Sequence, residues 1–327
     1  MTKLLMNEPQ NIINEMLEGM IFSNPEISLD IDERVIFRTQ KENKVGLVSA
    51  GGSGHEPAHA GFVGEGMLDA AVAGNVFSSP SPMQMLSGIR HANSGKGVLM
   101  ILKNYSGDLM NFRLAKQMAE AEGIVVDSVI VKDDVAVPDS TYSTGRRGIA
   151  GTILVHKIAG AAAKKGYSLE KVKEVAQKTI DSVRSMGMSM SACTIPGLEN
   201  PGFSVGEGIE IGMGIHGEPG VEKTSLKTSS EIAKILFGRI MDDYDYSGKE
   251  VAVLVNGLGA TPLMELYVFA NDISRLLDES EIKPTLVLVG NYMTSLNMAG
   301  CSLSILEVDD ELRELLKTPC KTLGLNL

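Results

Sequence analysis

The chain has 327 residues, of which 43% are hydrophobic and 5% aromatic, and it carries a formal net charge of −11 at pH 7. This length exceeds what one small core needs and predicts two domains. The acidic balance argues against nucleic acid or an anionic membrane surface as a direct partner. No apolar run reaches the ~18 residues that a membrane span requires. The first residues also lack the pattern of a signal peptide.

The cysteine content bears on the compartment and on metal binding. Cys193, Cys301 and Cys320 are the three cysteines, and none belongs to a CxxC pair. Such spacing favours neither disulfides nor a zinc site, and it is typical of a reducing compartment. The sequence also has no HExxH motif for zinc and no GxxxxGK[ST] loop for a nucleotide phosphate. We therefore expect a cytoplasmic protein that binds no metal.

Compact apolar runs alternate with helix-like segments from Lys44 onward. Buried strands are predicted at 44–50, 97–104 and 124–131, with helices at 82–92, capped by Ser81, and near 109–123. Strands separated by such helices imply right-handed crossovers and a parallel sheet that is covered on both faces. A long helix is predicted at 168–187. Residues 1–185 are thus expected to form an N-terminal α/β domain with a mainly parallel sheet flanked by helices.

A second set of elements follows a stretch rich in glycine and proline. Helices are predicted at 229–243 and 261–279, strands at 250–257, 284–291 and 301–308, and an amphipathic helix after them. We place the domain boundary after residue 185, so that residues 186–327 form a C-terminal α/β domain. The predicted fold class is therefore α/β, with two α/β domains.

Three glycine-rich loops could carry chemistry. The loop GGSGHEP, at 51–57, offers backbone N–H groups suited to a small polar ligand or a phosphoryl group, and it fits a plain strand-to-helix turn equally well. Lys103 and Asp108 flank the second loop, where an isolated aspartate is more often a helix cap. The third loop, GIHGEPG, contains His216. Its glycines would let a ligand approach this ring closely, although a histidine in a turn is usually a solvated ring.

The remaining histidines have structural interpretations. His59 lies one helical turn beyond His55 and is expected on a helix surface. His91 is expected to be solvated on an amphipathic helix, and His156 to lie in a core or an interface. The acidic run MDDYDY, at 241–246, is most simply a solvated turn.

Four long motifs occur in an order that resembles the dihydroxyacetone kinase family. They are GGSGHEPAHAGFVGEGM, KNYSGDLMNF, RRGIAGTILVHKIAG and GMGIHGEPG. The resemblance is to the substrate-binding K domain of that family and covers essentially the whole chain. It implies two α/β domains in each subunit and pairing of two subunits as a homodimer.

The resemblance also implies roles for individual residues. His216 matches the histidine that bonds covalently to the carbonyl carbon of dihydroxyacetone as a hemiaminal. His55 matches a histidine that hydrogen-bonds the bound triose, and Asp108 matches the proposed general base for the substrate hydroxyl. Further substrate contacts are expected from Gly52, Gly54 and Lys103.

The family resemblance allows two interpretations of the activity, and it favours the first because kinase subunits are the commoner type. In the first, the chain is the substrate-binding subunit of a phosphotransferase-dependent kinase. ADP or ATP and magnesium would then be held by a separate L subunit, and this chain would bind no cofactor. In the second, it is a catalytically silent co-activator that binds dihydroxyacetone and joins a TetR-like transcription factor. Ala50 stands where the family usually has a third glycine, and the tail lacks the expected tryptophan; both departures favour the co-activator. An unrelated NAD-type oxidoreductase is a remote third interpretation.

Overall fold

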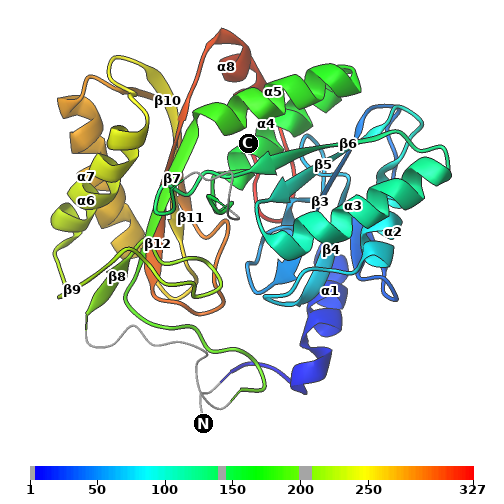
Figure 1. Cartoon of the computed structure of the whole chain (residues 1–327), viewed down its shortest axis with the longest axis horizontal. Coiled ribbons are helices and arrows are strands. Elements are labelled where there is room, and N and C mark those ends of the chain that lie inside the picture. The colour runs from blue at the N-terminus through cyan, green and yellow to red at the C-terminus, as the bar shows by residue number, and fades with distance from the viewer. Residues whose placement is uncertain (1–3, 139–144, 199–207) are drawn as a thin grey trace.

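The computed structural model describes residues 4–138, 145–198 and 208–327 (Figure 1). Two six-stranded sheets organise this part of the chain, in the orders β1-β2-β4-β3-β5-β6 and β11-β10-β12-β7-β8-β9. Helices flank both sheets (Figure 1). The predicted α/β class is therefore confirmed.

The first sheet is parallel at its centre. Its strands are β1 (Ile27–Asp30), β2 (Val35–Arg38), β3 (Gly46–Ser53), β4 (Ala70–Val76), β5 (Val98–Lys103) and β6 (Val126–Val131). β4, β3, β5 and β6 pair in parallel, whereas β1 and β2 add an antiparallel edge. The helices α2 (Pro82–Ala92) and α3 (Ser106–Ala121) connect parallel strands, as predicted, and Ser81 caps α2 in a capping box with Gln84.

The second sheet is mainly antiparallel. Its strands are β7 (Val183–Ser189), β8 (Ile209–Ile211), β9 (Glu222–Thr224), β10 (Glu250–Gly257), β11 (Lys283–Gly290) and β12 (Gly300–Glu307). Of its pairs, β10 with β11 runs parallel and the others run antiparallel. The helices α6 (Ser229–Asp243) and α7 (Leu263–Glu279) pack on one face of this sheet, and α8 (Asp310–Leu316) follows β12.

Two helices, α4 (Thr152–Lys164) and α5 (Leu169–Ser182), lie between the sheets (Figure 1). The helix α1 (Ile12–Ser23) packs near β1. α4 is buried along all its residues but the last, including the polar residues His156 and Lys157. Ile158 of α4 belongs to the same hydrophobic core as Leu99 of β5 and Leu254 of β10. The two sheets therefore share one core.

The prediction of one helix over 168–187 is wrong at its end. α5 ends at Ser182, and the next residues form β7, which pairs with β12. The ladder to a distant strand overrides the helical pattern there, as tertiary pairing often does. Residue 185, where we place the domain boundary, lies inside β7, so the division into two domains stays a prediction.

The acidic run at 241–246 is not a solvated turn, contrary to expectation. Asp243 accepts hydrogen bonds from both Arg146 and Arg184. Tyr246 is fully buried, and its hydroxyl lies within hydrogen-bond distance of the carbonyl oxygens of Ser182 and Ile305. Within the described residues, no helix is both long and apolar enough to cross a bilayer.

Candidate active site

The predicted site residues lie at or just beyond the ends of strands of both sheets. His55 follows β3, Asp108 lies in the first turn of α3 just after β5, and His216 lies in the loop between β8 and β9. The first two positions are at the carboxyl ends of parallel strands, where α/β proteins commonly bind ligands. The loop after β11 connects these segments, because Thr294 Oγ1 donates to the Glu56 carbonyl and Ser295 Oγ to the Ile215 carbonyl.

A pair of histidines forms the centre of the site. His55 is fully buried, and its Nε2 atom lies 3.0 Å from Nε2 of His216. Nδ1 of His55 lies 2.8 Å from the carbonyl oxygen of Thr294. On the opposite side, Nδ1 of His216 lies 2.9 Å from Oε1 of Glu218. One line of hydrogen bonds therefore runs from Thr294 through both rings to Glu218.

The partners of these rings fix where the protons lie. A carbonyl oxygen only accepts, so Nδ1 of His55 carries hydrogen. Burial, together with Lys103 and His216, holds the pKa of His55 well below its usual value, so this ring is neutral and its Nε2 accepts. Nδ1 of His216 donates to the Glu218 carboxylate, and its Nε2 faces Nε2 of His55.

Glu218 stays ionised beside His216. Burial alone would raise the pKa of this carboxyl, but the hydrogen bond and the charge interaction with His216 outweigh it and lower the pKa to about 2. The same carboxylate accepts from the backbone N–H of His216 through Oε2, at 3.0 Å. Glu218 therefore orients the His216 ring and places a negative charge beside it.

Asp108 and Lys103 form a second buried part of the site. Asp108 is 3% exposed, and its Oδ1 atom has no hydrogen-bond partner among the described residues. Burial raises the pKa of Asp108, while the charges of Lys103 and His216 oppose the shift. Burial lowers the pKa of Lys103, with Asp108 and Glu218 opposing. A carboxylate with a raised pKa and an unused oxygen is suited to accept a proton.

The glycines of the first loop allow an aromatic ring to reach the histidines. Gly52 lies inside β3, and a side chain there would begin 2.6 Å from the backbone nitrogen of Ser78. Gly54 has a φ of +103°, and a side chain there would begin 2.8 Å from Phe77. The Phe77 ring in turn stacks on His55 and meets His216 edge-on. A larger residue at Gly52 or Gly54 would displace the segment that carries Phe77 from its place beside the two histidines.

Two contributors to the site were missed by the sequence analysis as functional residues. Glu218 is one, and the spacing HGE, with Gly217 at a φ of +83°, was an available signal for it. Tyr105 is the other. Its ring centroid lies 4.7 Å from that of His216, and its buried hydroxyl has no partner among the residues described. An aromatic ring there gave no sequence signal beyond its place in the motif KNYSGD.

The other histidines lie outside this pair. The prediction that His59 is on a helix surface is wrong, because it is 6% exposed, and its Nδ1 lies 3.1 Å from Nε2 of His156. The segment turns under β3 into a short 3-10 helix instead of continuing as a surface helix. The prediction of a core position for His156 is confirmed. His91 is 30% exposed and stacks on Phe37, so it is only partly solvated.

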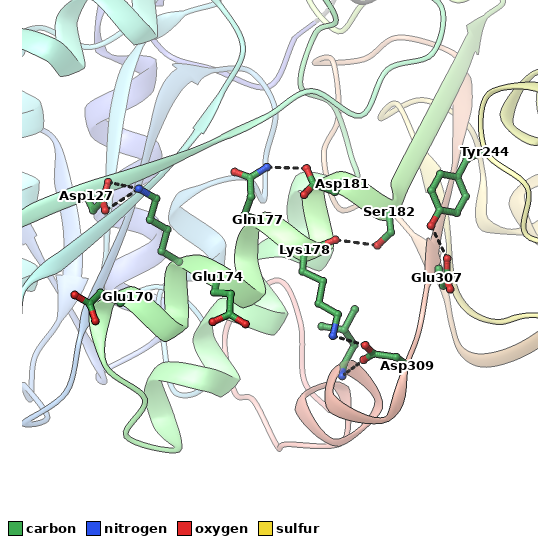
Figure 2. Close-up of a pocket in the computed structure, with 12 residues that line it drawn as sticks. Asp127, Glu170, Glu174, Gln177, Lys178, Asp181, Ser182, Tyr244, Glu307 and Asp309 are labelled. Carbon is green, nitrogen blue, oxygen red and sulfur yellow. Dashed lines mark hydrogen bonds and ion pairs between the residues drawn. The ribbon is translucent and has the colours of Figure 1, made fainter.

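A cavity of about 900 Å³ has none of these histidines in its lining (Figure 2). Its walls come mainly from α5, with residues from β6, β12 and the segment around Tyr244. Lys173 bridges to Asp127 and Lys178 to Asp309 across it (Figure 2). Because its cations already have carboxylate partners, we assign it no part in the chemistry above.

Taken together, the fold and the site define a two-sheet α/β protein with a ligand site built around a histidine held by a carboxylate. The Dak1 domain matches residues 18–324, and the chain belongs to this family. The interpretation as an unrelated NAD-type oxidoreductase is therefore wrong.

Two relatives and one solved structure are especially similar. The dihydroxyacetone-binding subunit DhaK of PTS-dependent dihydroxyacetone kinase 1 from Listeria innocua is 51% identical, over 98% of this chain and 99% of its own length. The corresponding subunit of Lactococcus lactis is 47% identical, over 94% of each chain. The structure of the dihydroxyacetone kinase operon co-activator DhaQ superposes with a TM-score of 0.90 at 36% identity, covering 96% of this chain and 97% of that one.

Proposed function

We propose that this protein is the dihydroxyacetone-binding subunit of a phosphotransferase-dependent dihydroxyacetone kinase. The relatives named above that share about half of its residues are such subunits, and they match along nearly their full lengths. The observation that carries the proposal is the geometry of His216. Its Nδ1 is held by Glu218, and its Nε2 faces the buried, neutral ring of His55. This arrangement suits reversible addition to a ketone.

Capture of the ketone can be written with protons and electrons balanced. Because Glu218 holds Nδ1–H of His216, the lone pair on Nε2 is available to react. That lone pair forms a bond to the carbonyl carbon, and the electron pair of the C=O π bond moves to oxygen. This oxygen then takes a proton from water, which gives a hemiaminal hydroxyl. Glu218 compensates the remaining positive charge on the alkylated ring. Glycerol has no carbonyl and cannot react in this way.

In the proposed kinase, Asp108 accepts the proton of the triose hydroxyl as that oxygen attacks phosphorus. The phosphoryl donor, with its magnesium, belongs to a separate nucleotide-bearing L subunit, and this chain holds no cofactor of its own. Tethering the triose through His216 fixes the attacking hydroxyl, which removes much of the entropy cost of the encounter.

The co-activator function is the second candidate, because a co-activator structure matches this fold at a TM-score of 0.90. Ligand capture alone does not separate the two functions, since both use the bound ketone. Binding to a TetR-like regulator only in the presence of dihydroxyacetone would support the co-activator. The higher identity to kinase subunits favours the kinase.

The deciding experiment is a product assay. We expect dihydroxyacetone phosphate to form when the chain is mixed with an L subunit, its phosphoryl-donor system and dihydroxyacetone. Omitting this chain, or replacing dihydroxyacetone by glycerol, should leave the product at background. A chain that captures dihydroxyacetone but yields no product with a competent L subunit would contradict the kinase and favour the co-activator.

Glu218→Gln should weaken capture of dihydroxyacetone by about 10- to 100-fold. A hydrogen bond to a charged partner contributes about 1.5–3 kcal/mol, and the variant loses the charge that holds Nδ1 of His216. Calorimetric titration of the chain alone measures the effect. Glu174→Gln, at an exposed residue of α5, is the matched control and should bind like the wild type. Equal affinities for the two variants would remove Glu218 from the mechanism.

Two further features are part of the proposal. The protein is a cytoplasmic homodimer, as its family implies. Its cysteines are free and buried, which fits a reducing compartment. Exposed apolar side chains on and beside α7, among them Met264, Tyr267 and Val287, offer a surface that a second copy could cover. A single-chain mass by light scattering would contradict the dimer.

A further inference from the structure

Arg147 is a buried cation close to the loop that carries His216. It lies in the segment between β6 and α4, and it is 8% exposed. Its Nε donates to Oδ2 of Asp134 at 2.8 Å, and its Nη2 lies 2.7 Å from the same oxygen. Nη2 also donates to the carbonyl oxygen of Gly212, at 2.8 Å. One guanidinium therefore connects a segment of the first half of the chain to the start of the His216 loop.

The guanidinium of Arg147 and the carboxylate of Glu218 both lie beside the Cα atom of Gly214. A side chain on Gly214 would begin 2.6 Å from Nη1 of Arg147 and still closer to Oε2 of Glu218. The absent side chain thus leaves room for both charged groups on one side of the loop. Their opposite charges favour this arrangement in a buried setting. The backbone N–H of Gly214 donates to the carbonyl of Glu218, which closes the turn around His216.

Asp134 holds the Arg147 guanidinium in a fixed position. It is 1% exposed, and its Oδ1 accepts from the backbone N–H of Ala136 at 3.0 Å. Its backbone N–H donates to the carbonyl of Arg147, and the next residue, Val135, donates to the carbonyl of Ser185 in β7. Because Asp134 is held by the backbone on both sides, Arg147 has little freedom to move away from the loop.

We propose that Arg147, held by Asp134, is a positioning residue that keeps Glu218 aimed at Nδ1 of His216 and so prepares the ring to capture its ketone. This inference rests on the proposed function, in which His216 bonds the ligand. Arg147 acts through Glu218 and the Gly212–Gly214 backbone. It is offered as a support of the loop, and no contact with the ligand is required of it.

The test uses the full chain and two substitutions. Arg147→Met removes the charge, and Arg147→Lys keeps a cation opposite Asp134 but lacks the planar fork that reaches Asp134 and Gly212 together. We expect the dissociation constant for dihydroxyacetone to rise about 100-fold in Arg147→Met and about 10-fold in Arg147→Lys, since small displacements of a reacting group have effects of this size. Arg147→Lys also covers the case in which Arg147→Met does not fold.

Arg146→Met is the matched control, because Arg146 pairs with Asp243 and not with the His216 loop. It should bind dihydroxyacetone like the wild type. A second readout needs no ligand: long-range 1H–15N spectra should show an altered hydrogen-bond state at Nδ1 of His216 in both Arg147 variants and not in Arg146→Met. Wild-type affinity and an unchanged His216 spectrum in folded Arg147→Lys would overturn the inference. Failure of the wild type to capture the ketone would instead overturn the proposed function.

Discussion

Replacing His216 by alanine should abolish covalent capture of dihydroxyacetone. The variant lacks the nitrogen that adds to the carbonyl in the proposed mechanism, while His55 remains buried and held by Thr294. With a competent L subunit, kcat/KM should fall by at least about 100-fold, because an untethered triose no longer holds its hydroxyl in line and a displacement of ~1 Å can have that effect. Native mass spectrometry measures the adduct as a mass increment of one triose.

Two controls make this result specific to His216. His91→Ala removes a partly exposed histidine on α2 and should keep the full increment. Glycerol should give no increment with any variant, because it has no carbonyl. With carbonyl-labelled dihydroxyacetone, the wild type should also convert the carbonyl carbon signal into that of a tetrahedral carbon. A retained increment in His216→Ala would place the covalent bond on another group.

Local sequence patterns predicted the parts of the fold in which neighbours along the chain are also neighbours in space. The parallel strands β3, β5 and β6 and their connecting helices follow from the alternation of apolar runs and helices. The antiparallel strands β8 and β9 have three residues each, too few to show a period. The local pattern predicts helix over the first residues of β7, because the strand depends on pairing with β12, more than 100 residues later.

The site, too, depends partly on contacts between residues that are far apart in the sequence. The motifs contain His55, Asp108 and His216, so their presence was predicted, and the structure brings the two histidines to 3.0 Å. The role of Glu218 depends on the turn that folds its carboxylate back onto His216. Arg147 contacts the carbonyl of a residue 65 positions away, which no local pattern encodes. Such contacts arise only when the two sheets come together.

Replacing Asp108 by asparagine should nearly abolish phosphorylation and leave capture of the triose intact. An amide does not accept the hydroxyl proton, and a general base contributes about 10²- to 10⁴-fold to the rate. We therefore expect kcat to fall by that factor in the assay with an L subunit, with the dissociation constant for dihydroxyacetone within about 3-fold of the wild type, since the change is nearly isosteric. Asp127→Asn, at a partly exposed carboxylate of β6 paired with Lys173, is the matched control.

Asp108→Asn should also be at least as stable as the wild type at neutral pH. Burial raises the pKa of the Asp108 carboxyl above its ordinary value, against the opposing effect of Lys103. A carboxyl whose pKa is raised on folding stabilises the folded state at low pH, and this contribution is lost as the pH rises through the folded pKa. At neutral pH, above the ordinary pKa of an aspartate carboxyl, the raised pKa makes folding of the wild type less favourable, and the asparagine variant lacks this effect.

The combination of these two effects identifies a base rather than a structural residue. A structural aspartate would lose stability and activity together when it is replaced. Asp108 should lose activity while the midpoint of thermal unfolding is unchanged or higher, as is common where a site holds an unfavourable group for its chemistry. Turnover of Asp108→Asn at the wild-type rate would show that the hydroxyl proton leaves by another route. The oxygen of Asp108 without a partner would then need a different explanation, such as a ligand contact that forms only in the complex.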